Sequence, residues 1–398
     1  MRVAKDVTAP ASVARMLAGL LEASHLATFD DLPGLVARHG AAAGLGNVVA
    51  YIPDIREEDL IRLDDTTARL TIDTTAAGWA FRNVDVVTSQ SSLWVPMLDG
   101  TERIGVLGAT AGGGDTVVSL RALASLAALL VVSKRPHSDS YPAIVRSRPM
   151  SLPSEVIWPL MPPLTFATKD LAVAAVLEPS YEIGGDAVDY AMAPDQLHLS
   201  MFDAMGHDQS AGLTVAIATG ACRNTRRRGA ALPEIADAID DAIARQFDRK
   251  RFATGVLAHL RPSTGLLTWV NLGHPPPLLI RQGRWLTTLR CRPAPPMGFA
   301  LGIPATECRY HLEPGDRVLF YTDGITEARD HLGHEFGLRR FTELVARGAA
   351  DGFPAPETLR RLMRAVLAHQ NGRLQDDATV LMLEWRGDQQ RRLTLGSG

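Results

Sequence analysis

The fold of this chain is decided by the stretch MFDAMGHDQSAGL, residues 201–213. The stretch begins at the end of an apolar run in which Leu197, Leu199 and Met201 occupy alternate positions, as in a strand with one buried face. The carboxylate Asp203 follows on the same strand, and a helix is predicted to start a few residues later. Burial disfavours the charged form of a carboxylate, so an aspartate at this position calls for a chemical explanation.

The composition is that of an ordinary globular protein. The chain has 398 residues, enough for two or three domains, with 46% hydrophobic and 21% charged residues. The net charge of −3 argues against nucleic acid as the main partner. The three cysteines, Cys222, Cys291 and Cys308, lack metal-type spacing. Such a sparse, odd set predicts a reducing compartment and no disulfide framework.

The sequence predicts a cytoplasmic location. Its N-terminus lacks the unbroken apolar segment of a signal peptide. The longest largely apolar run, residues 123–132, is too short to cross a bilayer. We therefore expect no membrane partner.

Residues 1–135 are predicted to form a first, α+β domain. The pattern predicts helices at 12–23, 32–43 and 116–132, a strand at 47–54, and a hairpin of strands 93–98 and 103–110. Asp99 and Gly100 supply the hairpin turn. This order of elements resembles a GAF sensor domain, which implies a small-molecule ligand. We also expect helices 12–23 and 116–132 to be able to pair two chains as a homodimer.

Residues 136–164 are predicted to be a linker, because prolines and polar residues are frequent there. An amphipathic stretch at 155–160 leaves two interpretations open: a simple connector, or a helix that couples the two domains. Residues 387–398 are expected to be a disordered tail.

Residues 165–386 are strand-rich and predict a sheet sandwich covered by helices. Near-continuous apolar runs such as DRVLFYTDG and DATVLMLEW are typical of strands buried on both faces. Helices are predicted at 211–227, 232–246, 338–347 and 357–369.

Aspartates stand at the edges of several of these apolar strands: Asp186, Asp203, Asp323, and the pair Asp376 and Asp377. Any one of them can be explained as a turn former. Together they would meet at one end of a sandwich, where carboxylates repel one another unless a cation neutralises them. Oxygen ligands suit Mg²⁺ or Mn²⁺, and two such ions can clamp a phosphate and activate a water.

Small residues beside these aspartates fit the same hypothesis. Gly184 and Gly185 allow the backbone to approach closely before Asp186, and Gly324 permits a tight turn. The short side chain of Ala204 leaves its carbonyl open to a cation.

The motifs YEIGGDAVDY, MFDAMGHDQSAGL, NLGHPPPLL, VLFYTDGITEARD and QDDATVLML resemble, in this order, a PPM-type metal-dependent serine/threonine phosphatase of the bacterial SpoIIE/RsbU branch. The resemblance implies an αββα sandwich with two Mn²⁺ or Mg²⁺ ions. It implies that Asp203 bridges both ions and that the Ala204 carbonyl binds one. Asp186 would serve one ion, and Asp323 and Asp376 the other. Asp377 remains an alternative to Asp376.

The chain departs from the family pattern beside the bridging aspartate. The branch reads DxxGHG where this chain has Asp208 in place of the last glycine; Asp208 is interpreted as a helix cap or as a catalytic residue. His207 is a candidate catalytic general acid, although the better-known family form places its histidine at the position of Met205. His274 is a turn residue or a catalytic one, and Asp189 is expected to be structural.

The basic run RNTRRRG, residues 223–229, has two interpretations. Its charges complement the dipole at the end of a solvated helix, or they form a docking patch for an acidic or phosphorylated partner.

The resemblance implies a phosphatase acting on phosphoserine or phosphothreonine of a partner protein and regulated by the GAF-like domain. By the same resemblance, the partner would be a phosphorylated STAS-type anti-sigma-factor antagonist. Two alternatives stay open: a phosphatase-shaped scaffold that binds a signalling partner, and a two-metal hydrolase of a small phosphoester.

Overall fold

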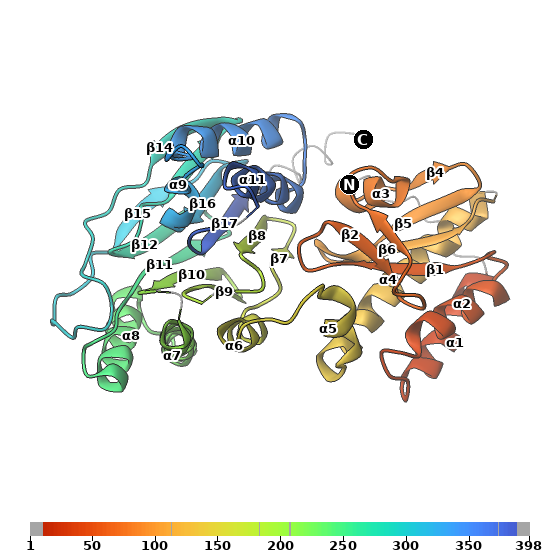
Figure 1. Cartoon of the computed structure of the whole chain (residues 1–398), viewed down its shortest axis with the longest axis horizontal. Coiled ribbons are helices and arrows are strands. Elements are labelled where there is room, and N and C mark those ends of the chain that lie inside the picture. The colour runs from red at the N-terminus through yellow and green to blue at the C-terminus, as the bar shows by residue number, and fades with distance from the viewer. Residues whose placement is uncertain (1–10, 113, 183, 207, 373, 388–398) are drawn as a thin grey trace. The chain divides into compact units, whose positions relative to one another are not determined.

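A computed structural model describes residues 11–112, 114–182, 184–206, 208–372 and 374–387. The chain divides into two compact units, Met1–Pro149 and Met150–Gly398 (Figure 1). The tail expected at 387–398 lies almost wholly outside the described residues.

The first unit is built on a six-stranded antiparallel sheet. The strand order is β3-β2-β1-β6-β5-β4. The strands are β1 (Val49–Pro53), β2 (Asp59–Arg62), β3 (Arg69–Thr71), β4 (Val87–Ser89), β5 (Ser92–Asp99) and β6 (Glu102–Thr110). The predicted hairpin is confirmed: Asp99 pairs with Glu102, and Gly100 takes the left-handed φ of 59° that its turn requires.

Helices cover both faces of this sheet. One face packs on α1 (Ala11–Ser24), α2 (Leu32–Ala42) and α4 (Gly114–Lys134), and the other on α3 (Ala76–Asn83). The 3₁₀ turn η1 (Arg135–His137) and α5 (Ser140–Val145) follow α4, and α5 adds Val145 to the same core as α1. The unit is α+β as expected, and its likeness to a GAF domain stays a prediction.

Helix α4 is more apolar than the sequence analysis allowed. With the residues that follow it, it forms a segment, Asp115–His137, that is long and apolar enough to cross a membrane by length and composition alone. Its residues Leu120, Leu123, Ala127 and Val131 are nevertheless buried in the core of the first unit. This packing is that of the core helix of a globular domain.

The residues predicted as a linker are shared between the units. Helix α5 packs in the first core, whereas α6 (Leu152–Leu160) packs in the second. The Ser151 hydroxyl accepts a hydrogen bond from the Ser154 amide and caps α6. The Trp158 indole donates to the Ser180 carbonyl at 2.7 Å, which fixes α6 on the second unit.

The second unit contains two antiparallel sheets. The first has the order β15-β12-β11-β10-β9 and the second β14-β13-β16-β17-β8-β7. The strands are β7 (Thr165–Ala167), β8 (Leu171–Glu178), β9 (Asp186–Ala193), β10 (Gln196–Ala204), β11 (Ala253–Arg261), β12 (Leu266–Leu272), β13 (Leu278–Arg281), β14 (Arg284–Thr288), β15 (Cys308–His311), β16 (Arg317–Tyr321) and β17 (Ala378–Trp385). Strand β11 was not predicted.

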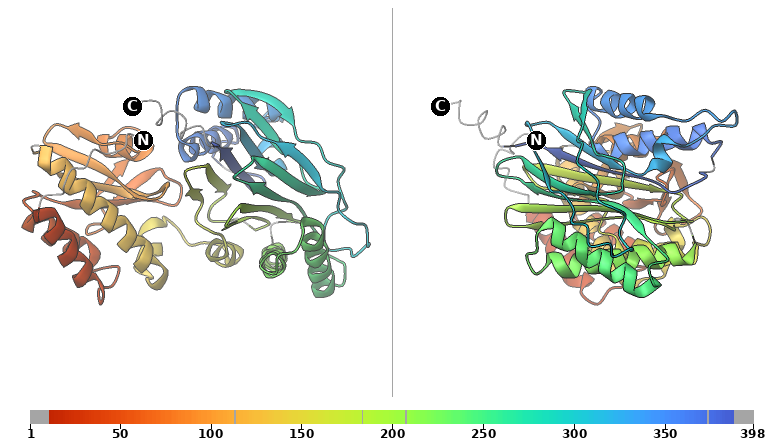
Figure 2. Two further views of the ribbon diagram at one scale, coloured as in Figure 1. Left: turned by 180° about the vertical axis from the view of Figure 1, so that it is seen from behind. Right: turned by 90° about the vertical axis from the view of Figure 1, so that its left-hand side faces the viewer.

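The helices of the second unit form the outer layers. Helices α6, α7 (Gln209–Arg226) and α8 (Leu232–Phe247) cover the first sheet. Helices α10 (Leu338–Ala350) and α11 (Ala355–His369) cover the second, while α9 (Asp323–Thr326) is a single turn after β16. The predicted αββα sandwich is confirmed, and its layers are visible in Figure 2.

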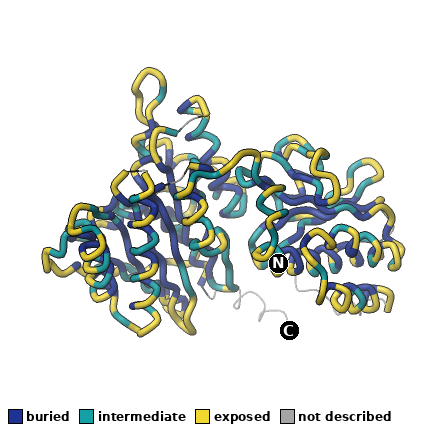
Figure 3. The backbone as a smooth tube through the Cα atoms, turned by 60° about the horizontal axis from the view of Figure 1, so that its bottom comes forward, coloured by how far each residue is buried: buried dark blue, intermediate teal, exposed yellow. Residues whose placement is uncertain are grey.

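Strand β10 carries the period-two pattern that opened the sequence analysis. Leu197, Leu199 and Met201 lie in the core between the two sheets. Phe202 and Ala204 lie on the opposite face, in the core beneath the helices. Figure 3 shows the strands as the buried part of the domain. The same alternation directs Asp203 to the inner face, at the end of the sandwich.

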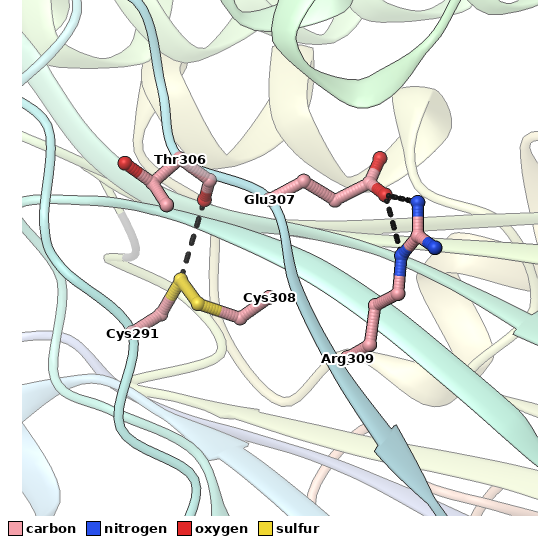
Figure 4. Close-up of a disulfide and its surroundings, with 5 residues drawn as sticks. All are labelled: Cys291, Thr306, Glu307, Cys308 and Arg309. Carbon is pink, nitrogen blue, oxygen red and sulfur yellow. Dashed lines mark hydrogen bonds and ion pairs between the residues drawn. A yellow bond between two sulfur atoms is a disulfide. The ribbon is translucent and has the colours of Figure 1, made fainter.

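The expectation of no disulfide is wrong. Cys291 and Cys308 are bonded to each other, and Cys222 is a free, buried thiol (Figure 4). The pair escaped prediction because the two residues lie 17 positions apart and meet only at the base of one loop. The cytoplasmic location stays a prediction, and it loses the support drawn from unpaired cysteines.

Candidate metal centre

Two of the predicted aspartates face each other across neighbouring strands. Asp203 of β10 pairs in register with Asp186 of β9, so both side chains lie on the inner face of the same sheet edge. Residues directly opposite in an antiparallel pair have Cβ atoms about 4.5–5.5 Å apart, and like charges there destabilise the sheet. Asp186 is only 1% exposed. The register therefore forces two carboxylates together at a buried position.

The second sheet brings further carboxylates to the same end of the sandwich. Asp323 opens α9 directly after β16, and Asp376 lies two residues before β17. Strands β16 and β17 are paired neighbours, with Tyr321 opposite Val380. Asp203, Asp323 and Asp376 line one pocket of about 720 Å³ that opens to solvent. Its other lining residues are Ala204, Met205, Gly206, Phe252, Thr254 and Gln375.

Hydrogen bonds join the two sheets beneath this pocket. The Thr322 hydroxyl donates to Asp186 at 2.9 Å and so orients the buried carboxylate. The amides of Gly184 and Gly185 both donate to Oδ2 of Asp377, at 2.9 and 2.7 Å. The Asp377 carboxylate therefore binds the backbone that precedes β9, whereas Asp376 is exposed and lines the pocket.

Glycines give the backbone its close approach at this point. A Cβ on Gly185 would lie 2.8 Å from the Ala204 carbonyl oxygen and 2.7 Å from that of Gly206. A Cβ on Gly324 would lie 2.0 Å from the Asp377 carbonyl oxygen. Gly206 has a left-handed φ of 82°. Glycine at 185 thus avoids a Cβ that would collide with the Ala204 carbonyl oxygen.

Electrostatics in the pocket favours a bound cation. Burial, together with the charges of Asp323, Asp376 and Asp377, raises the pKa of Asp203 to about 7. Burial and the neighbouring Asp203 and Asp377 raise the pKa of Asp186 well above its usual range. The pKa of Asp323 is raised by burial and by Asp376. Within the described part of the chain, no cationic side chain is among the causes of these three shifts.

The residues around the pocket offer oxygen atoms as possible metal ligands. Among the described residues, no group of three or more His, Cys, Asp or Glu side chains is already placed to hold a metal ion. The donor set still fits hard divalent cations, because all its atoms are oxygens, and Ala204 lines the pocket beside the carboxylates. A cation would also remove the repulsion that raises the carboxylate pKa values.

The loop after Asp203 is held by an arginine that the sequence analysis did not single out. His207, the candidate general acid in this loop, lies outside the described residues. Asp208 caps α7 by accepting from the Ala211 amide at 2.8 Å. Arg251 donates to Asp208 at 2.6 and 3.0 Å and to the Met205 carbonyl at 3.0 Å. The capping interpretation of Asp208 is thus confirmed.

His274 lies behind the pocket and does not line it. Its Nδ1 is 2.9 Å from the hydroxyl of Thr254, a pocket residue that pairs with Asp203 across β10 and β11. Asn271 bonds the backbone of His274 in both directions, at 2.7 and 2.9 Å. Burial lowers the pKa of His274 to about 4. The neutral imidazole of His274 therefore holds the Thr254 hydroxyl by a hydrogen bond. No local sequence pattern indicated that Thr254 would line the pocket.

The basic run at 223–229 has a role that neither sequence interpretation included. Arg223 and Arg226 turn inward to the buried Asp189 of β9, with closest distances of 2.6 and 2.7 Å. The interpretation of the run as solvated, or as a docking patch, is wrong for these two arginines. The expected structural role of Asp189 is confirmed, because its ion pairs attach α7 to the sheet.

The comparisons with known proteins identify this part of the chain. Residues 193–386 match the family model "Stage II sporulation protein E (SpoIIE)". We call this matched part of the chain, just under half of its length, the SpoIIE domain. Asp203, Asp323 and Asp376 lie inside the matched range, and Asp186 lies just before it.

The SpoIIE domain is similar to two curated proteins. One is "Phosphoserine phosphatase RsbU" of Bacillus subtilis, 22% identical over 54% of this chain and 63% of that protein. The other is "Protein IcfG" of Synechocystis sp., 27% identical over 34% of this chain and 21% of that protein. The chain thus spans less than two thirds of the length of each.

Among solved structures, the chain resembles that of the RsbU and RsbW domains of Rv1364c from Mycobacterium tuberculosis. The identity is 25% and the TM-score 0.48, over 55% of this chain and 62% of that one.

Proposed function

We propose that the SpoIIE domain is a metal-dependent phosphatase that hydrolyses phosphoserine or phosphothreonine on a partner protein. The observation that carries this proposal is the pocket at the end of the sandwich, where Asp203, Asp323 and Asp376 from both sheets meet and burial raises the pKa of Asp203 to about 7. The described lining residues include carboxylates and no cationic side chain, which is what a cation-binding site requires.

In the proposed site, two Mn²⁺ or Mg²⁺ ions are held by five oxygen-bearing residues: Asp186, Asp203, Ala204 through its carbonyl, Asp323 and Asp376. When bound, such ions stabilise the charge of the phosphoryl oxygens and lower the pKa of a water. Thr322 orients Asp186, and Asp377 holds the backbone of Gly184 and Gly185 beside the Ala204 carbonyl.

Hydrolysis then requires little else from the chain. A water attacks phosphorus in line, the bond between phosphorus and the serine oxygen breaks, and that oxygen takes a proton as it leaves. His207 is the candidate donor of this proton.

Several features support a protein substrate over a small phosphoester. The pocket is open to solvent, and Phe252 is the single aromatic residue in its described lining. A small aromatic or nucleotide ligand would need more stacking surface. The similar curated protein RsbU is a phosphoserine phosphatase by name. We propose a STAS-type anti-sigma-factor antagonist as the phosphorylated partner.

We further propose that the GAF-like unit regulates the phosphatase through α6, in a chain able to form homodimers. Helix α6 packs on α7, where a Cβ on Gly212 would lie 3.0 Å from the Cβ of Pro153. Helix α7 begins at Gln209, directly after the loop that follows Asp203. A shift of α6 would therefore be transmitted to the loop beside the carboxylates.

The test is hydrolysis of p-nitrophenyl phosphate by the full chain with Mn²⁺, Mg²⁺ or EDTA. Asp203→Asn and Asp323→Asn should each reduce kcat at least about 100-fold, since each removes a charged ligand. Asp195→Asn is the matched control, because Asp195 lies in the hairpin at the opposite end of β9 and β10. Metal-independent activity, or full activity in both site variants, would overturn the proposal.

The second candidate function is a scaffold that binds a signalling partner. It is retained because no group of three or more His, Cys, Asp or Glu side chains among the described residues is already placed to hold a metal ion. Calorimetry with Mn²⁺ separates the two. A phosphatase binds the ion and loses that binding in Asp203→Asn, whereas a scaffold shows no binding in either protein.

A further inference from the structure

The segment between β14 and β15, residues 289–307, is a long connection without a helix or a regular strand. Loops of this length without secondary structure are uncommon in compact domains and are usually functional. This loop also carries exposed aliphatic side chains at its tip, with Leu301 59% and Ile303 55% exposed. We refer to it as the 289–307 loop.

The loop is held in place at several points. The disulfide between Cys291 and Cys308 closes its base (Figure 4). Met297 exchanges two backbone hydrogen bonds with Ala253 of β11, at 2.8 and 2.9 Å. Near the tip, a carboxylate oxygen of Asp240 on α8 accepts from the amides of Gly298 and Ala300, at 2.5 and 3.0 Å. The exposed aliphatic residues are therefore presented by an ordered backbone, which lowers the entropy cost of binding.

The loop is continuous with the carboxylate pocket. The ring of Phe299 stacks on that of Phe252 with centroids 5.2 Å apart. Phe252 itself lines the pocket, together with Asp203. A polypeptide with its phosphorylated side chain in the pocket would thus pass directly onto the loop.

A groove runs between the loop and α8 and combines apolar and acidic surface. Leu272, Met297, Leu301 and Ile303 contribute to its apolar lining, and Asp237 of α8 lies at its side. The groove is shallow and open to solvent. Leu301 and Ile303 are exposed at its rim, so an aliphatic side chain of a partner can pack against them.

Asp237 gives this groove its charge preference. It is exposed, and none of the ion pairs or hydrogen bonds found among the described residues involves it. Partial burial and the carboxylates of Asp240, Asp241 and Glu234 raise its pKa. An anionic segment would be repelled here, and a lysine or arginine would supply the missing positive charge.

We infer that this groove is the docking surface for the phosphoprotein substrate, which it binds through an aliphatic side chain adjacent to a lysine or arginine. The inference rests on the proposed function of the neighbouring pocket. The phosphorylated residue is directed to the carboxylate pocket, while the unmodified flanking segment occupies the groove. Clustered exposed apolar side chains rimmed by polar residues mark protein interaction sites.

The probes are synthetic phosphoserine peptides in which a Leu-Lys pair is moved from three to ten residues away from the phosphoserine. A matched set carries Leu-Glu instead. With the wild-type chain, we expect at least one Leu-Lys spacing to have a KM about tenfold below its Leu-Glu counterpart, equivalent to about 1.4 kcal/mol. Equal KM values at every spacing would overturn the inference.

The variant Leu301→Ser/Ile303→Ser should raise KM for the preferred peptide about tenfold and leave hydrolysis of p-nitrophenyl phosphate unchanged. Asp237→Asn, an exposed substitution that the fold tolerates, should reduce the preference for Lys over Glu about threefold. Met192→Ser is the matched control, because Met192 is 39% exposed at the far end of β9. Retention of the full preference in both groove variants would contradict the docking role.

A binding measurement separates this inference from the proposed function. Fluorescence anisotropy of the labelled Leu-Lys peptide is recorded in EDTA, where catalysis plays no part. Binding that is weakened by the groove substitutions would support the groove even if p-nitrophenyl phosphate were not hydrolysed. Hydrolysis of that compound with no peptide binding would support the phosphatase and reject the groove.

Discussion

Arg251 and Asp208 form a bidentate ion pair beside the loop that follows the central carboxylate Asp203. The same guanidinium donates to the Met205 carbonyl at 3.0 Å, one residue from the Ala204 carbonyl proposed to bind a metal ion. The glycine expected by family resemblance at position 208 could not make this pair. This chain thus fixes the loop by an ion pair attached to the start of α7.

Removing the guanidinium should weaken metal binding. In Arg251→Ala, the Met205 carbonyl loses its donor and the loop after Asp203 loses its attachment. We expect Mn²⁺ affinity to fall about tenfold, as is common when a group that orients a ligand is removed. Calorimetric titration with Mn²⁺ measures this. Arg245→Ala, at an exposed arginine paired with Asp241, is the control, and equal affinity in both variants would contradict the prediction.

The two adjacent aspartates before β17 should respond differently to substitution. Asp377→Asn weakens the acceptor for two buried backbone amides, so the free energy of unfolding should fall by about 1–3 kcal/mol. Asp376→Asn should leave stability almost unchanged and abolish activity, since Asp376 is exposed in the pocket. Urea unfolding and p-nitrophenyl phosphate hydrolysis together measure both effects. The reverse pattern would assign the ligand to Asp377.

Stability without metal should fall as the pH rises. The folded-state pKa of Asp203 is about 7, raised mainly by burial, whereas an unfolded aspartate titrates near 3.9. A raised carboxylate pKa stabilises the fold below the unfolded pKa, and this contribution is lost as the pH rises towards 7. We expect a loss of about 2–4 kcal/mol between pH 4 and 8 in EDTA.

Saturating Mn²⁺ should remove this loss, because the cation replaces the proton. Urea unfolding at several pH values, with and without Mn²⁺, provides the measurement. Asp203→Asn is the control and should have a flatter pH dependence in EDTA. A pH dependence that Mn²⁺ does not alter would argue against cation binding by these carboxylates.

Removing the disulfide should affect the 289–307 loop more than the catalytic pocket. The variant Cys291→Ser/Cys308→Ser opens a loop closed over a sequence separation of 17 residues, and we expect a loss of about 3 kcal/mol in stability. The KM for the preferred Leu-Lys peptide should rise several-fold, with hydrolysis of p-nitrophenyl phosphate retained. Cys222→Ser serves as the control for the substitution of a thiol. An unchanged peptide KM would show that the loop is ordered without the disulfide.

Local patterns in the sequence were enough to predict the layers of the second unit. The alternation of Leu197, Leu199 and Met201 predicted the inner face of β10, and long apolar runs predicted β16 and β17. These patterns are local because the side-chain period of a strand or helix is a property of a few consecutive residues. The order of the acidic motifs also predicted which aspartates would lie at strand ends.

Only the tertiary structure decided how these residues meet. The register of β9 and β10 placed Asp186 opposite Asp203. The approach of the two sheets brought Asp377 within hydrogen-bonding distance of the two glycine amides before β9. The bond between Cys291 and Cys308, and the pairing of Arg251 with Asp208, were likewise without a local signal. Such contacts join residues far apart in the chain, and they depend on packing and register that no short stretch of sequence contains.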